Sequence, residues 1–256
     1  MNTTLFDLSG RCALVTGGSK GLGRAMATAF AAAGADLAIA SRNEKELAAA
    51  ADAIHRQHGV RVEPIAADLY RPEEVERLAD AAIQRLGRID ILVNNAGTNI
   101  PQPIDQIRDE DWDRVLQLNL TSCMALTRAL VPGMKQRRWG RIIHISSIMG
   151  LSSKEGRNVY SATKTALIGL ARASALDLGP FGITVNCIAP GIFATELPMS
   201  ILSPQEQTQA AARTALGRWG QPDELAGPAL LLASDAGSYI SGSVLLVDGG
   251  LLCRAL

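Results

Sequence analysis

Hydrophobic residues along this chain fall into two patterns that alternate from one end to the other. Short, nearly continuous runs of Ala, Val, Ile and Leu predict buried β-strands. Longer stretches with apolar residues at helical spacing predict amphipathic helices. Strands are predicted at residues 11–16, 36–40, 60–66, 89–93, 141–146, 183–188 and 244–247. Helices are predicted to end near residues 33 and 57, and to occupy residues 72–86, 109–137, 159–178 and 222–234.

Strands that alternate with helices, without a break in composition, are typical of one α/β domain. We therefore expect a single domain over residues 1–256, built as a Rossmann-type doubly wound parallel sheet of about seven strands flanked by helices. Residues 196–217, which include Pro198 and Pro204, follow neither pattern. Because an irregular segment at the carboxyl end of a strand suits a mobile cover, residues 191–217 are expected to form a substrate lid.

Composition narrows the class of protein. The chain has 25 basic and 25 acidic side chains, so no positive excess favours nucleic acid. No apolar run approaches the roughly 18 residues of a membrane span, and the start lacks the apolar segment of a signal peptide, so we expect no membrane association. The cysteines form no metal-binding pattern, which indicates reduced thiols in a cytoplasmic protein and no metal site. They are Cys12, Cys123, Cys187 and Cys253.

A glycine-rich turn joins the first predicted strand to the first predicted helix. Its glycines have the spacing G-x-x-x-G-x-G. Such a turn lets the backbone approach a diphosphate, and the N-terminus of the following helix offers N–H groups to bind it. The motif alone is often only a turn, but its position between a strand and a helix favours nucleotide binding. The expected cofactor contacts here are Gly17, Ser19, Lys20, Gly21, Leu22 and Gly23.

The end of the second predicted strand bears on the choice between NADP and NAD. An acidic residue at this point binds the ribose hydroxyls of NAD, but this chain has Ser41 and Arg42 instead. Arg42 and Lys20 are each able to make a charge-assisted contact with a 2′-phosphate, so we expect NADP to be preferred. The alternative is that both are ordinary surface cations. Glu44 lies close enough in sequence to keep NAD open as the cofactor.

Two further loops follow predicted strands at the same edge of the sheet. Asp68 and Leu69 come after the third strand. Asp68 accepts a hydrogen bond from the adenine amino group, caps the next helix, or does both. Asn95, Ala96 and Gly97 come after the fourth strand. They form either an Asn-rich turn or part of a ligand site at the carboxyl ends of parallel strands.

Tyr160 and Lys164 carry the main candidate chemistry. They are four residues apart in a predicted helix, so their side chains leave the same face. A phenol in water ionises near pH ~10, and an adjacent ammonium stabilises the phenolate, so the pair suits proton exchange with a hydroxyl or carbonyl. Ser147 follows the fifth strand and is placed to hold the substrate oxygen. In isolation, a Tyr and a Lys at this spacing are more often surface residues.

Two polar residues interrupt apolar patterns. Asn119 lies within the long predicted helix, where Asn is a poor helix former. Its amide either bonds to solvent or a buried water, or is simply tolerated. His144 lies in the fifth predicted strand. It is a candidate base, although we expect a hydrogen-bonded core histidine.

Taken together, these motifs resemble the short-chain dehydrogenase/reductase family over essentially the whole chain. Their joint occurrence in order is more specific than any one of them. The matching residues are Thr16 and Gly17 with Gly21 and Gly23, Asp68, residues 94–97, Asn119, Ser147, Tyr160 with Lys164, and Pro190 and Gly191 with Thr195.

The resemblance implies a role for each matched residue. Tyr160 is the general acid/base, and Ser147, thirteen positions before it as in family members, orients the substrate oxygen. Lys164 favours the ionised phenol and holds the nicotinamide ribose, while Asn119 supports a water that relays protons through Lys164. Family members are commonly homotetramers. Further cofactor contacts are implied at Pro190, Gly191, Ile192 and Thr195.

The expected activity is hydride transfer between a nicotinamide cofactor, NADP rather than NAD, and a small carbonyl or secondary alcohol substrate. Within the family the chain resembles gluconate 5-dehydrogenases, which suggests a sugar acid such as gluconate or 5-ketogluconate. The alternative is a 3-oxoacyl-carrier-protein reductase, and a remote one is a non-catalytic cofactor-sensing scaffold. Three cations near the expected substrate pocket either meet an acidic substrate or lie in solvent. They are Lys154, Arg157 and Arg213.

Overall fold

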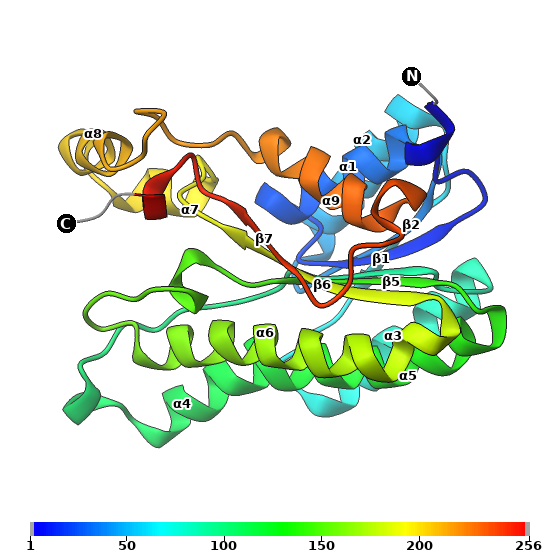
Figure 1. Cartoon of the computed structure of the whole chain (residues 1–256), viewed down its shortest axis with the longest axis horizontal. Helices are drawn as coiled ribbons and strands as arrows, with labels where there is room; N and C mark the ends of the chain where they lie inside the picture. The colour runs from blue at the N-terminus through cyan, green and yellow to red at the C-terminus, as the bar shows by residue number, and fades with distance from the viewer. Residues whose placement is uncertain (1–2, 254–256) are drawn as a thin grey trace.

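A computed structural model describes residues 3–253 of the chain (Figure 1). Seven strands within these residues form one parallel sheet in the order β3-β2-β1-β4-β5-β6-β7. The predicted seven-stranded α/β domain is therefore confirmed, and no predicted strand end is more than two residues from the observed one. The strands are β1 (Cys12–Thr16), β2 (Asp36–Ser41), β3 (Val62–Ala66), β4 (Ile91–Asn94), β5 (Gly140–Ile145), β6 (Ile183–Pro190) and β7 (Val244–Val247).

Helices cover both faces of the sheet (Figure 1). One layer contains α1 (Gly21–Ala32), α2 (Glu44–His58) and α9 (Ala226–Ala233). The other contains α3 (Pro72–Leu86), α4 (Asp109–Leu116), α5 (Ser122–Arg137) and α6 (Asn158–Leu178). Every residue of β1, β5 and β6 is buried. Strands covered on both faces need apolar residues on both, which explains their continuous apolar runs.

The strand order places one edge of the sheet in position to bind a ligand. The chain runs outward from β1 to β3 and then returns to lay β4 on the other side of β1. In an open parallel sheet, the loops at the carboxyl ends of the strands diverge at such a switch point and leave a crevice. The loops after β1, β4, β5 and β6 therefore meet at this carboxyl edge.

The prediction of an irregular segment at residues 196–217 is wrong. This segment contains α7 (Glu196–Ile201) and α8 (Pro204–Ala212), which lie beyond the end of β6 in Figure 1. α8 begins with a capping box, in which the side chains of Ser203 and Glu206 each accept from the other residue's backbone N–H. None of its residues is buried. The helix is therefore stabilised by local hydrogen bonds and not by a buried apolar face. For this reason its sequence shows no hydrophobic periodicity.

The helix predicted over residues 109–137 is interrupted rather than continuous. A π-helical turn, Gln117–Thr121, separates α4 from α5 and has Asn119 at its centre. Such turns are rare and often occur at functional sites. Pro132 lies inside α5, which continues to its end at Arg137. The helix predicted at residues 222–234 also begins differently, as a 3₁₀ turn that becomes α9.

The cysteines are free thiols, as predicted. Cys12, Cys123 and Cys187 are buried, and Cys253 is exposed. Burial raises the pKa of Cys123 to about 11 and that of Cys187 to about 12, so these thiols stay protonated.

No helix within residues 3–253 has both the length and the apolar character to cross a membrane. The same range contains no group of His, Cys, Asp and Glu residues suited to a metal ion.

Candidate active site

Tyr160 and Lys164 lie in the first two turns of α6, at the carboxyl edge of the sheet. The Nζ atom of Lys164 lies 5.6 Å from the centroid of the Tyr160 ring. Lys164 is only 4% exposed, and its Nζ donates a 2.7 Å hydrogen bond to the carbonyl oxygen of Ile145, at the end of β5. The strand therefore holds the buried ammonium beside the phenol.

The two serines after β5 are used differently. Ser146 donates its hydroxyl proton to the backbone carbonyl of Lys164 at 2.8 Å, which attaches α6 to the sheet. The Ser147 hydroxyl accepts a 3.1 Å bond from the N–H of Met149 and keeps its own proton for another acceptor. This difference favours Ser147, as predicted from its spacing, as the serine that binds a substrate oxygen.

Asn119 connects the loop after β4 to α6. It has no exposed surface. Its side chain accepts from the N–H of Thr98 (2.8 Å) and donates to the carbonyl of Thr98 (2.9 Å) and to the hydroxyl of Thr163 (3.1 Å). Thr163 then donates to the carbonyl of Tyr160 at 2.8 Å. The amide is thus bonded within the protein, and the sequence reasoning missed Thr98 and Thr163, whose only signal is that each adjoins a motif residue.

Gly97 brings the loop after β4 against both groups. A Cβ at this position would lie 3.4 Å from Asn119 Oδ1 and 3.4 Å from Lys164 Nζ. The absence of a side chain therefore keeps the space between the loop and Lys164 open.

Asn95 joins the same loop to the glycine-rich turn. Its Nδ2 donates a 2.8 Å bond to the carbonyl of Thr16. The backbone N–H groups of Asn95 and Ala96 both donate to the Thr16 hydroxyl at 3.0 Å. These bonds hold the ends of β1 and β4 together beneath the expected cofactor.

The glycine-rich turn fits a diphosphate. Gly17 and Gly21 have φ values of +66° and +57°, a region that favours glycine. A Cβ at Gly23 would lie 2.2 Å from the carbonyl oxygen of Gly17, so no side chain fits there. The N-cap of α1, Lys20, makes no side-chain cap bond. The first N–H groups of the helix are therefore available to a phosphate.

The loop after β6 reaches the glycine-rich turn. Pro190 ends β6, and Gly191 passes so close to β7 that its Cβ would lie 2.7 Å from the Cα of Asp248. Thr195, four residues further, lies 3.4 Å by its Cγ2 from the Cβ position of Gly21. Thr195 thus faces the glycine-rich turn across the edge of the sheet, while the contact predicted at Ile192 stays a prediction.

The two cations predicted to bind a 2′-phosphate have different surroundings. Lys20 forms ion pairs with Glu46 (3.6 Å) and Glu196 (3.3 Å), and all three side chains are exposed. Arg42 lies over the ring of Tyr70 at 5.3 Å from its centroid. Of these two cations, Arg42 is the one that forms no ion pair with a carboxylate within residues 3–253.

Asp68 does not cap the following helix, so that part of the prediction is wrong. Its Oδ1 accepts a 3.3 Å bond from the N–H of Tyr70, whereas the N-cap of α3 is Arg71. Leu69 is buried, and its carbonyl accepts a 3.3 Å bond from the side chain of Gln117 in the π turn. The carboxylate of Asp68 thus closes a local turn at the carboxyl edge.

His144 is a core residue, but it is not fully hydrogen-bonded as predicted. Its Nδ1 lies 3.1 Å from Nδ2 of Asn94, while Nε2 has no partner in the described part of the chain. Burial, with the charge of Lys164 as a second cause, lowers the pKa of His144 to about 4. The ring is therefore neutral near pH 7 and enclosed, which excludes it as the base.

The three cations near the expected substrate pocket remain without acidic partners. Lys154 and Arg213 are exposed, and Arg157 is half-buried as the N-cap of α6. None of them forms an ion pair with another residue in the range 3–253.

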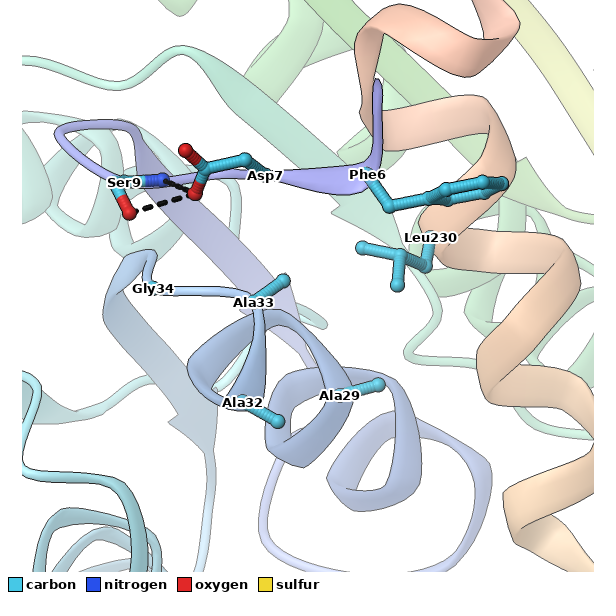
Figure 2. A pocket seen from close by; sticks show the side chains of 8 residues that line it. All are labelled: Phe6, Asp7, Ser9, Ala29, Ala32, Ala33, Gly34 and Leu230. Carbon is cyan, nitrogen blue, oxygen red and sulfur yellow. Dashed lines mark hydrogen bonds between the residues drawn. The ribbon is translucent and has the colours of Figure 1, made fainter. Parts of the chain in front are cut away.

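A cavity of about 600 Å³ elsewhere on the surface is separate from this site (Figure 2). It is lined by the last turn of α1, by Leu230 of α9 and by residues before β1. Gly34, on its rim, leads into the start of β2, so the cavity lies at the amino edge of the sheet. The catalytic candidates lie at the opposite edge.

Comparisons with known proteins find relatives that match nearly the whole chain. The family model described as enoyl-(acyl carrier protein) reductase matches residues 17–252. The 3-oxoacyl-[acyl-carrier-protein] reductase of Aquifex aeolicus is 35% identical over 95% of this chain and 98% of its own. The gluconate 5-dehydrogenase of Gluconobacter oxydans is 37% identical over 96% of each chain. A crystal structure of gluconate 5-dehydrogenase from Burkholderia cenocepacia with NADP and tartrate is 36% identical, has a TM-score of 0.93 and covers 100% of both chains.

Proposed function

The chain belongs to the short-chain dehydrogenase/reductase family, and from that membership we propose that it transfers a hydride between NADP and a small carbonyl or secondary alcohol substrate. The observation that carries the proposal is the packing of Tyr160, Lys164 and Ser147 at the carboxyl edge, beside a turn that fits a diphosphate. Bound there, the nicotinamide would supply or accept the hydride.

The side chains of this site perform the proton transfer. In the reducing direction Tyr160 gives its phenolic proton to the carbonyl oxygen, and Ser147 donates a hydrogen bond to the same oxygen. Lys164, held by the carbonyl of Ile145, offsets the charge that remains on the phenolate. In the oxidising direction the phenolate takes the proton back. Asn119 supports this arrangement by connecting the loop after β4 to α6, and we propose that a water beside it relays protons to Lys164.

The proposed cofactor contacts follow the carboxyl edge from strand to strand. Arg42 without a carboxylate partner favours NADP, as does the NADP bound in the Burkholderia relative. Glu44, close to Arg42 in the sequence, and Glu46, paired with Lys20, keep NAD as the alternative. The contacts are Gly17, Ser19, Lys20, Gly21, Leu22, Gly23, Ser41, Arg42, Asp68, Leu69, Asn95, Ala96, Gly97, Tyr160, Lys164, Pro190, Gly191, Ile192 and Thr195.

The Tyr160→Phe variant tests the reaction. Losing a positioned acid/base should lower kcat by about 10²- to 10⁴-fold, while the Kd for NADP stays the same. Tyr239→Phe is the matched control, because Tyr239 is fully exposed. Undiminished turnover by Tyr160→Phe would refute the assignment. Tight NADP binding without turnover on any substrate would instead favour the cofactor-sensing scaffold.

Two substrate classes are supported by relatives of nearly equal similarity. We favour a sugar acid such as gluconate or 5-ketogluconate, because the relatives include gluconate 5-dehydrogenases and one of them was crystallised with tartrate, a hydroxy acid. The second candidate is a 3-oxoacyl thioester, from the similarity to 3-oxoacyl-carrier-protein reductases. A panel of keto sugar acids, β-ketoesters, 3-oxoacyl thioesters and simple ketones with NADPH separates them by kcat/KM.

We also propose that the protein is a cytoplasmic homotetramer. Buried free thiols suit a reducing compartment. Large apolar side chains are exposed on α5, α6 and β7, at Met124, Leu176 and Leu246, and contacts between subunits would bury them. Light scattering on the purified protein should give about four times the 27.0 kDa of one chain, and a monomer would contradict the proposal.

A further inference from the structure

Two arginine side chains lie within cation–π distance of the ring of Tyr70. The guanidinium carbon of Arg42 lies 5.3 Å from the ring centroid, and that of Arg114 lies 4.5 Å from it. Arg42 follows β2, Tyr70 lies in the loop after β3, and Arg114 belongs to α4. Three segments that are distant in the sequence thus bring these side chains to one corner of the carboxyl edge.

Neither arginine forms an ion pair with an acid among the described residues, although the charge of Arg114, after the hydrogen bond from Arg108, is one of the causes that lower the pKa of Asp111. No ion pair joins Arg42 or Arg114 to an Asp or Glu within residues 3–253, whereas Lys20 pairs with both Glu46 and Glu196. Two cations held near one ring repel each other, and an anion between them would remove that repulsion. The corner lies at the end of β2, where a sheet of this class places the adenosine ribose of a dinucleotide.

Building on the proposed NADP-dependent function, we propose that Arg42 and Arg114 together bind the 2′-phosphate of NADP, with Tyr70 as the residue that positions them. The ring of Tyr70 attracts both guanidinium groups by cation–π interaction and limits their motion. Guanidinium groups bind phosphate in a bidentate manner. The two arginines therefore strengthen the binding of NADP, whereas NAD, which has a hydroxyl in place of the 2′-phosphate, makes no such contact. Lys20 then contributes less to binding the 2′-phosphate, because its ammonium already pairs with the carboxylates of Glu46 and Glu196.

Equilibrium binding of NADP and NAD to the purified full chain, measured by calorimetry, tests this without relying on activity. We expect Arg114→Gln to weaken NADP binding about tenfold and to leave NAD binding unchanged. Tyr70→Leu should weaken NADP binding about two- to fivefold, and Tyr70→Phe, which keeps the ring, should match the wild type. Arg172→Gln is the charge-matched control, because Arg172 is an exposed arginine of α6.

A further variant tests whether Tyr70 acts through the arginines. In the Arg42→Gln/Arg114→Gln background, Tyr70→Leu should no longer change NADP binding. Because NAD binding reports an intact site, a loss confined to NADP cannot come from misfolding.

Several outcomes would overturn the inference. Equal losses of NADP and NAD affinity would give Tyr70 and Arg114 a structural role only, and stronger NADP binding by Tyr70→Leu would mean that the ring holds Arg42 away from the phosphate. If the wild type prefers NADP and Arg114→Gln keeps that preference, the inference fails while the proposed function stands. If the wild type does not prefer NADP, the cofactor preference fails as well.

Discussion

Among single residues, Thr163 shows how the proposed catalytic set depends on a side chain outside it. Its hydroxyl accepts from Asn119 and donates to the carbonyl of Tyr160, and it has no exposed surface. Thr163→Val keeps the shape but leaves the Asn119 amide without one partner. We expect this variant to lose about 1–3 kcal/mol of stability and to lower kcat with an altered pH profile, while the Kd for NADP is unchanged. Thr163→Ser should restore both properties, and a normal kcat for Thr163→Val would contradict the positioning role.

His144 predicts how stability depends on pH. Its pKa is about 4 in the folded protein and about 6.5 in an unfolded chain. Between these values the unfolded chain binds a proton that the folded chain does not, so stability is complete above pH ~6.5 and falls as the pH drops towards 4. From pH 6.5 to 5 the wild type should lose about 2 kcal/mol more than His144→Thr in urea unfolding. Equal slopes for the two proteins would show that the burial of His144 does not govern this loss.

The elements differ in how well the sequence predicts them, because they are held by different interactions. β1 and β6 are predictable because burial on both faces requires apolar residues throughout. α8 has no buried residue and rests on its Ser203–Glu206 capping box, so its hydrophobic pattern carries no signal. The π turn shifts the backbone bonds by one residue, and only the misplaced Asn119 marks it.

The residues of the candidate site also differ in how well the sequence predicts them. Helix spacing places Tyr160 and Lys164 on one face, and Ser147 follows a strand, but their assignment as the catalytic set depends on the resemblance to the family. Thr163 and Tyr70 could not be predicted, because their partners come from segments that meet only when the chain is folded.

The lid predicted at residues 191–217 stays a proposal, and the backbone bonds near its two ends are consistent with it. Ala194 N–H donates to the carbonyl of Gly220 (2.8 Å), and Gly220 N–H donates to that of Ile192 (3.0 Å). Between these ends α8 is attached by the Trp219 indole, which donates a 2.9 Å bond to the carbonyl of Gln207. The segment is also tied at Leu216, whose N–H donates to the carbonyl of Gly249 (3.1 Å), so we propose that α7 and α8 are the part that moves.

If these helices close over the substrate, Trp219→Phe should raise KM for the carbonyl substrate several-fold and leave the Kd for NADP unchanged, because only the attachment of α8 is lost. Trp112→Phe, in α4, is the control. Hydrogen exchange in residues 196–212 should slow when substrate and NADP bind together. Unchanged exchange in the ternary complex would argue against a lid.

Across the whole molecule, the two edges of the sheet differ in structure: the carboxyl edge has room for a ligand, and the amino edge is held by buried hydrogen bonds. The carboxyl edge consists of loops and glycines that leave room for a ligand. The amino edge is closed by a buried carboxylate, Asp90, which is 1% exposed. It accepts from the N–H of Cys12 (3.1 Å) and from the side chains of Arg88 (2.9 Å) and Arg137 (3.2 Å). These bonds tie β1, β4 and the end of α5 together away from the chemistry.

This separation predicts that stability and cofactor binding respond independently to changes at the amino edge. Asp90→Ala leaves the Cys12 N–H without its acceptor and two arginines without their acid. We expect a loss of about 2–4 kcal/mol in urea unfolding, less than for a fully buried pair because both arginines are partly exposed. Below the transition, the Kd for NADP should equal that of the wild type. Asp80→Asn, at an exposed site on α3, is the control for the lost charge. A weaker NADP complex in folded Asp90→Ala would show that the amino edge also shapes the site, because the strands between the two edges would then transmit the change.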